Sequence, residues 1–113
     1  MTRTLVIHLE TSKEEPTTAV PTDCVLDLNG FGDVIGVEII NMAHNTGHRA
    51  PGSHGLATTG SGERVHWSYD QEADAFNVSI KEERSIDQRN ARCSVGGARD
   101  GRLIRIAVEY SKE

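Results

Sequence analysis

The chain has little cysteine and proline, few aromatic residues, and no long hydrophobic run. Its 113 residues include two Cys, three Pro, one Trp, two Tyr and two Phe. Two cysteines without a Cys-x-x-Cys spacing are too few for a disulfide framework or a zinc ribbon. The first apolar run spans only Leu5–Ile7, whereas a secretory signal needs about 7 to 15 apolar residues. We therefore expect a cytoplasmic protein with no membrane partner.

Aliphatic side chains must build the core, and most of them are β-branched. The chain has nine Val and eight Ile against six Leu, a bias that favours strands because stiff branched side chains pack well on a pleated surface. Apolar and polar residues alternate along 5–9, 65–69 and 76–80, as in half-buried antiparallel strands. The pattern predicts an all-β protein of roughly seven strands. The expected core is Leu5, Ile7, Leu9, Leu26, Ile35, Val37, Ile39, Val65, Trp67, Phe76, Val78, Ile80, Ile104, Ile106 and Val108.

Two segments are typical of β-hairpins and match each other along the chain. Each places two apolar strands around a glycine-containing loop. Cys24 and Cys93 are 69 residues apart, and so are Gly32 and Gly101. Such self-similarity indicates an internal duplication.

The duplication predicts an architecture of two degenerate repeats. Residues 1–40 and 63–113 would each form three or four antiparallel strands and pack as an intramolecular pseudo-dimer, in a sandwich or an open barrel. A chain of this length buries roughly 65% of its unfolded surface, enough for one core but not for two. We therefore expect a single domain in which both repeats share one core.

Residues 41–62 are predicted to be a linker that joins the repeats. This stretch holds five of the eleven glycines, three histidines and no acidic residue, and it has no apolar periodicity. His44 and His48 are four residues apart and His54 follows, so these three are the candidate metal ligands. Because no carboxylate or thiol accompanies them, a solvated linker is favoured and no cofactor is expected.

Two motifs resemble a known bacterial family. Residues 69–75 read Tyr-Asp-Gln-Glu-Ala-Asp-Ala before a strand, and residues 100–104 read Asp-Gly-Arg-Leu-Ile. Together with Val-Ile-Gly-Val-Glu-Ile at residues 34–39, they resemble domain of unknown function 2283. The first half lacks the Tyr-Asp opening. The resemblance implies a β fold in both halves, and it implies no activity or catalytic residue, because that family has none established.

Three carboxylates in the first of these motifs are candidates for a site. Asp70, Glu72 and Asp74 stand at i, i+2 and i+4, but a calcium loop also needs a glycine at its sixth position and an acid at its twelfth, which this sequence lacks. A hairpin turn in which Asp70 binds its own backbone is favoured. The alternative is a hydrolase-like enzyme that uses these carboxylates with His66.

The charge is acidic and uneven. Twelve basic and seventeen acidic residues give a net charge of −5, and residues 1–40 alone hold seven acids against two bases. Seven bases lie between Lys81 and Arg105, but acids interleave with them and the aromatic residues belong to the expected core. We therefore expect no nucleic-acid partner.

The sequence favours a non-catalytic interaction or regulatory module in a bacterial cytoplasm. Its partner would be another protein, or a second copy of the chain, added at a free edge strand. The alternatives are a small-molecule or metal-binding protein that uses the histidine-containing linker and, below that, the hydrolase-like enzyme.

Overall fold

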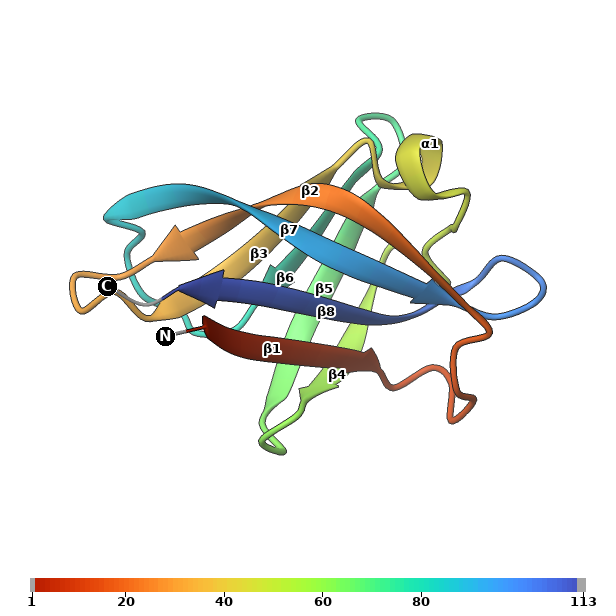
Figure 1. The fold of residues 1–113 in the computed structure, drawn as a ribbon, viewed down its shortest axis with the longest axis horizontal. Helices are drawn as coiled ribbons and strands as arrows, with labels where there is room; N and C mark the ends of the chain where they lie inside the picture. Colours follow the sequence, from red (N-terminus) through yellow and green to blue (C-terminus); the bar gives the residue numbers. More distant parts are fainter. Residues whose placement is uncertain (1, 112–113) are drawn as a thin grey trace.

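The computed structural model describes residues 2–111, which form eight strands and one short helix (Figure 1). The elements are β1 (Thr2–Leu9), β2 (Thr18–Leu28), β3 (Val34–Ile40), α1 (Met42–Thr46), β4 (His54–Thr59), β5 (Arg64–Asp70), β6 (Ala75–Ser79), β7 (Asp87–Gly97) and β8 (Leu103–Ser111). The prediction of an all-β protein is confirmed.

The eight strands close into one antiparallel barrel. Their order around it is β1-β4-β5-β6-β3-β2-β7-β8, and β8 pairs with β1. We expected a sandwich or an open barrel, whereas the barrel in the structure is closed. Every strand within residues 2–111 has a neighbour on both sides along at least part of its length, and the addition of a partner or a second copy at an edge strand stays a prediction.

Residues 41–62 are not the linker that the sequence predicted, because they contain α1 and β4. Strand β4 fills the position between β1 and β5, with Ile7 opposite Thr59 and Ala57 opposite Val65. Gly55 of this strand serves packing rather than flexibility, because a Cβ there would lie 2.8 Å from three atoms of the Trp67 indole.

The two predicted hairpins form with the same register. In β2 and β3, Leu26 lies opposite Val37; in β7 and β8, Val95 lies opposite Ile106, and each residue of the second pair is 69 positions after its counterpart. Strands of the two halves nevertheless interleave around the barrel, since β2 and β3 lie between β7 and β6 while β1 lies between β8 and β4. The described strands therefore form one continuous sheet and not two sheets packed face to face.

Aliphatic side chains fill the inside of the barrel. Thirteen of the fifteen expected core residues are buried, and Leu5 and Ile80 are partly buried. Trp67 and Phe76 stack with ring centroids 5.6 Å apart. The Cys24 and Cys93 thiols are free, buried and hydrogen-bonded to each other, and this bond together with burial raises the pKa of Cys93.

Within residues 2–111 the structure has no helix with the length and hydrophobicity that crossing a membrane requires.

Candidate functional site

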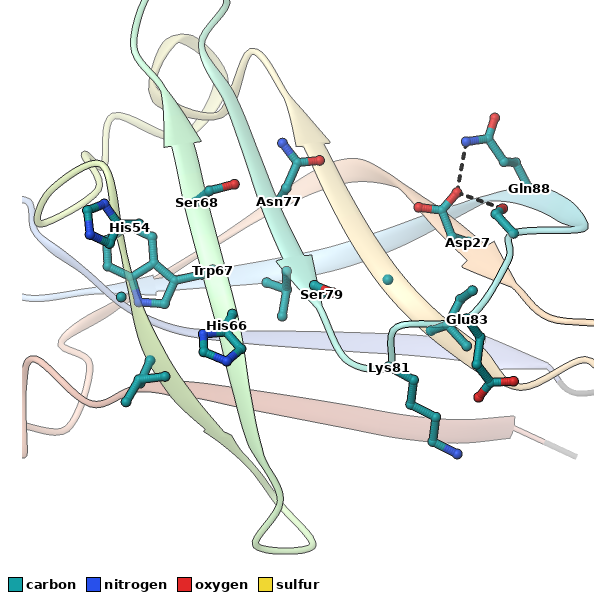
Figure 2. Close-up of a pocket in the computed structure, with 16 residues that line it drawn as sticks. Asp27, His54, His66, Trp67, Ser68, Asn77, Ser79, Lys81, Glu83 and Gln88 are labelled. Carbon is teal, nitrogen blue, oxygen red and sulfur yellow. Dashed lines mark hydrogen bonds between the residues drawn. The ribbon is translucent and has the colours of Figure 1, made fainter.

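A groove of about 780 Å³ crosses the outside of the barrel over β4, β5, β6, β3 and β2 (Figure 2). One wall is the segment 80–86, which connects β6 to β7. The polar side chains on the floor of the groove come from outward-facing strand positions, which alternate with the buried positions that fill the core.

The pairing registers place the groove residues in two rows that run across the strands. Directly opposite side chains on neighbouring strands have Cβ atoms about 4.5 to 5.5 Å apart, so each row is a continuous line of neighbours. The first row is Leu56, His66, Ser79, Gly36, Asp27 and Gln88, and the second contains His54, Ser68 and Asn77.

Gly36, in the middle of the first row, has no side chain, and the Asp27 carboxylate lies close over it, so that the row is open between this carboxylate and Ser79. A Cβ at this position would lie 3.1 Å from Asp27 Oδ2 and 3.4 Å from the Val78 carbonyl oxygen. A glycine inside a strand often marks a place where a ligand or another backbone approaches closely. The hollow therefore lies between the Ser79 hydroxyl on one side and the Asp27 carboxylate on the other.

Asp27 is held in one orientation by two donors. Ser85 Oγ and Gln88 Nε2 both donate to Asp27 Oδ1, at 3.2 and 2.8 Å. Its second oxygen accepts no hydrogen bond within residues 2–111, and in Figure 2 it points away from both donors, toward the side of the groove where Asn77 lies.

The wall of the groove is fixed at both ends. The Lys81 backbone N–H donates to the Ile35 carbonyl at 3.2 Å, and the Ile86 N–H donates to the Leu28 carbonyl at 2.8 Å. Glu83 accepts a hydrogen bond from the Asn29 amide at 3.1 Å. The Lys81 ammonium forms no ion pair within the described part of the chain, and in Figure 2 it points away from Asn77.

An aromatic side chain supports the β4 side of the groove. The Trp67 indole packs against Gly55 and stacks on Phe76. Its Nε1 is buried and has no hydrogen-bond partner among residues 2–111.

A second surface, on another side of the barrel, has the same strand register as the first row, but side chains cover it. Thr58, His8, Arg105 and Gly96 are opposite one another on β4, β1, β8 and β7, as His66, Ser79, Gly36 and Asp27 are on β5, β6, β3 and β2. This row, with the segment 10–17 that crosses it, is called the closed surface below.

Side chains occupy the middle of the closed surface. Arg105 stands where the groove has Gly36, and its guanidinium pairs with Glu15 at 3.2 Å. Gly96 stands where the groove has Asp27, and a Cβ there would lie 2.9 Å from the Pro16 ring. The position of the hollow is thus taken by an arginine and by a proline from the adjoining segment.

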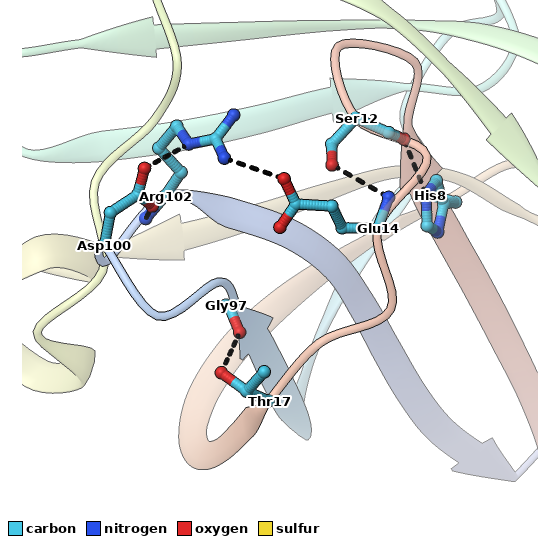
Figure 3. A network of polar contacts seen from close by, with 7 residues as sticks. All are labelled: His8, Ser12, Glu14, Thr17, Gly97, Asp100 and Arg102. Atoms are coloured by element: carbon cyan, nitrogen blue, oxygen red, sulfur yellow. Dashed lines mark hydrogen bonds and ion pairs between the residues drawn. The ribbon is translucent and has the colours of Figure 1, made fainter.

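Polar contacts fix the segment 10–17 over the closed surface (Figure 3). The Ser12 carbonyl oxygen is 3.0 Å from His8 Nε2, and the Thr17 N–H donates to the Gly97 carbonyl at 2.9 Å. Glu14 pairs with Arg102 at 3.2 Å. Asp100 accepts hydrogen bonds from the Arg102 N–H and guanidinium, which hold the pKa of Asp100 below its ordinary value.

The structure gives the predicted turn carboxylates structural partners. Asp70 Oδ1 accepts hydrogen bonds from the N–H groups of Glu72 and Ala73, at 3.0 and 3.2 Å. The expected turn, in which Asp70 binds its own backbone, is confirmed. Glu72 itself is exposed.

Asp74 anchors α1. Its carboxylate accepts hydrogen bonds from the Ala43 and His44 N–H groups and from the Tyr69 hydroxyl, the last at 2.7 Å. Burial opposes ionisation of Asp74, but these hydrogen bonds outweigh it and lower its pKa. The same contact raises the pKa of Tyr69 to about 12, because its proton is held by a carboxylate.

The predicted pairing of His66 with the turn carboxylates is not formed in the groove. His66 lines the groove, whereas Asp70, Glu72 and Asp74 do not. The carboxylates lie at the last residue of β5 and in the turn that follows it, while His66 lies near the other end of the strand.

The three candidate metal ligands lie apart. His44 is on α1, His48 is buried with Nε2 3.0 Å from the Thr18 hydroxyl, and His54 begins β4 beside the groove. Among residues 2–111 no group of three or more His, Cys, Asp or Glu side chains is arranged to hold a metal ion.

Comparisons with family models, with curated proteins and with solved structures find no match. The resemblance to domain of unknown function 2283 therefore stays a prediction. The fold and the site define a closed eight-stranded antiparallel barrel, within residues 2–111, that carries an open polar groove on its outer face.

Proposed function

We propose that the protein is a non-catalytic binding module that takes a small polar ligand in the groove. The observation that carries the proposal is the contrast between the open groove and the closed surface of the same register. A volume of about 780 Å³ falls within the range of about 300 to 1,000 Å³ of small-molecule sites. Ser68, Asn77 and Ser79 present polar groups that make no hydrogen bond within residues 2–111, so a ligand finds donors and acceptors along two rows.

The chemistry of the groove favours binding over catalysis. A nucleophile, its base and an orienting carboxylate must stand within hydrogen-bond reach of one another. His66 is opposite Ser79, but Asp27 is three strands from His66, and strands are about 4.8 Å apart. The carboxylate is therefore too distant to orient the imidazole.

The proposal includes an origin for the contrast, in which the two halves are degenerate copies related by a pseudo-twofold axis. The shared hairpin registers support it, and so does the antiparallel pair of β2 and β7, where Asp23 lies opposite Arg92, its counterpart 69 residues later. Two copies that start with one surface each are free to diverge. One surface would then have kept a ligand while the other gained Arg105 and Pro16.

The experiment places an arginine, the residue that the closed surface has at position 105, at the equivalent position 36 of the groove. A panel of amino acids, polyamines, sugars and nucleotides is screened by amide NMR against the wild-type protein and against Gly36→Arg. We expect at least one compound to shift the amides of His66, Ser68 and Ser79 in the wild type, and Gly36→Arg to abolish that shift.

Gly30→Arg is the matched control, because a Cβ at Gly30 meets nothing within 4 Å. It adds the same charge in the turn between β2 and β3 and should leave binding intact. If no compound shifts these amides, or if Gly36→Arg binds as the wild type does, the groove is not the binding site.

A further inference from the structure

We infer that the ligand of the groove carries a protonated amino or guanidinium group, which sits over Gly36 between Asp27 and Ser79. This inference rests on the proposed function and names the class of ligand. It is argued from the groups that face the hollow, from the charge of the groove, and from what fills the same position on the closed surface.

The nearest polar atoms over Gly36 are both acceptors. The position of an added Cβ is 3.1 Å from Asp27 Oδ2 and 3.4 Å from the Val78 carbonyl oxygen. A ligand carboxylate or phosphate there would face the Asp27 carboxylate, whereas an ammonium or guanidinium presents only donors, which both Asp27 Oδ2 and the Ser79 hydroxyl oxygen are able to accept. The hollow therefore selects a group that donates.

Asp27 is prepared to receive such a group. Ser85 and Gln88 both bind Oδ1, so the carboxylate is oriented before the ligand arrives, and Oδ2 is left 3.1 Å from the position of a Cβ on Gly36. Charge-assisted hydrogen bonds are roughly twice as strong as neutral ones, and a preoriented acceptor loses less entropy on binding.

The fixed charges of the groove also favour a cation. Asp27 and Glu83 line it against one lysine, Lys81. The strands on the Asp27 side, β2 and β3, carry Asp23, Asp27 and Glu38 and no lysine or arginine. A cation approaching this side of the barrel is attracted by these carboxylates.

The closed surface contains a cation at the equivalent position. Arg105 occupies the register position of Gly36, and its guanidinium pairs with the Glu15 carboxylate. On the closed surface the guanidinium comes from the chain itself. In the groove the equivalent position is Gly36, which leaves room for a cationic group of a ligand beside the Asp27 carboxylate.

The test compares ligands that differ in charge but little in shape. Butylguanidinium, agmatine and putrescine are the cationic probes, butylurea is the neutral isostere of butylguanidinium, and glutarate is an anionic probe without an amino group. Binding is measured by amide NMR and by calorimetry at low and moderate salt. We expect a cationic probe to shift the Ser79 and Gly36 amides, butylurea to bind at least about tenfold more weakly than butylguanidinium, and affinity to fall with added salt.

Variants assign the effect to Asp27. Asp27→Asn should weaken the cationic probe at least about tenfold, since it replaces a charge-assisted hydrogen bond with a neutral one. Asp23→Asn is the matched control, because Asp23 faces outward on the same strand and pairs with Arg92, so it removes the same charge outside the groove. Ser85→Ala, which removes one donor to Asp27 Oδ1, should weaken binding less than Asp27→Asn does.

The outcomes separate this inference from the function on which it rests. If butylurea, glutarate or another compound without a cationic group binds at the groove amides and Asp27→Asn has no effect, the inference is wrong and the binding function stands. If Asp23→Asn weakens the cationic probe as much as Asp27→Asn does, the attraction comes from net charge and the hollow over Gly36 has no special role. If no compound shifts the groove amides, both proposals fail.

Discussion

The groove and the closed surface have the same strand pairing and opposite character. The row of His66, Ser79, Gly36 and Asp27 leaves a hollow, while the row with the equivalent register has Arg105 at the glycine position. On the closed surface the charged groups bind one another, as Arg64 and Thr58 bind Glu10 and lower its pKa. In the groove, Asp27 Oδ2 and the Lys81 ammonium have no such partner within residues 2–111.

The difference shows how a missing side chain opens a groove on the outer face of a sheet. Outward positions on neighbouring strands form continuous rows, and one glycine opens a gap in a row without changing the backbone. The core below differs as well, since Trp67 and Phe76 lie under the groove where Thr59 and Leu5 hold the equivalent register positions under the closed surface.

The largest expected effect comes from removing the aromatic support of the groove. Phe76 is fully buried and stacks on Trp67, so Phe76→Ala should lower the free energy of unfolding by about 3 to 5 kcal/mol. Leu5→Ala, at the equivalent but partly buried position, should cost less than about 2 kcal/mol. Urea unfolding followed by the fluorescence of the single tryptophan measures both, and equal losses would show that the two surfaces rest on equivalent cores.

A smaller loss is expected where β4 meets the indole. Gly55→Ala places a Cβ 2.8 Å from the ring of Trp67, and overpacking of this kind costs about 1 to 3 kcal/mol. Gly60→Ala is the control from the same segment, residues 41–62. It places its Cβ 3.7 Å from Val6 and should change stability by less than about 0.5 kcal/mol. Equal effects in the same unfolding assay would mean that Gly55 has no packing role.

The glycines separate the part of the fold that the sequence predicts from the part that it does not. Alternation of apolar and polar residues predicted β1, β5 and β6, and the glycine-containing loops predicted both hairpins, because those signals are local. Strand β4 was missed because glycines in 41–62 indicated flexibility, whereas Gly55 makes room for a side chain far along the chain. Gly36 interrupting an apolar strand was the one available signal of the groove.

The members of the site could not be assigned from sequence for a related reason. His54 and His66 were candidates, but Asp27 and Ser79 were not, since they meet only through the registers of β2, β3, β5 and β6. The β2–β3 and β5–β6 registers belong to hairpins, but the pairing of β3 with β6, which joins these hairpins, brings together segments that are distant in the chain. The turn carboxylate Asp70, by contrast, was placed correctly because its partners are its own neighbours in the chain.

The hydrogen bonds of Asp74 predict a pH dependence for the turn beside β5 and β6. Its lowered pKa means that Asp74 stabilises the fold above about pH 4 and that this contribution is lost as the pH falls through the folded-state value. The pKa of Tyr69, raised to about 12, gives a contribution that is present below about pH 10 and is lost between about pH 10 and 12.

Asp74→Asn separates these contributions from those of the rest of the barrel. It should cost about 1 to 2 kcal/mol at neutral pH, as loss of a helix cap does, and return the pKa of Tyr69 toward about 10. Ultraviolet titration of tyrosinate in a Tyr110→Phe background reads Tyr69 alone. An unchanged Tyr69 titration would mean that the contact with Asp74 does not hold its proton.

The smallest effect on stability is expected from opening the closed surface. Arg105 and Glu15 are both exposed enough for water to screen their ion pair, so Arg105→Gly should cost at most about 1 kcal/mol. It restores the glycine that the groove has at Gly36, but it does not restore the acceptor, because Gly96 stands in place of Asp27 under the Pro16 ring. Arg105→Gly should therefore bind no cationic probe at the His8 and Arg105 strands, as amide NMR would show. Binding there would mean that the glycine alone makes the site and that Asp27 adds nothing to it. If Arg105→Gly binds no cationic probe, recognition requires both the glycine and the oriented carboxylate that the groove has in Gly36 and Asp27.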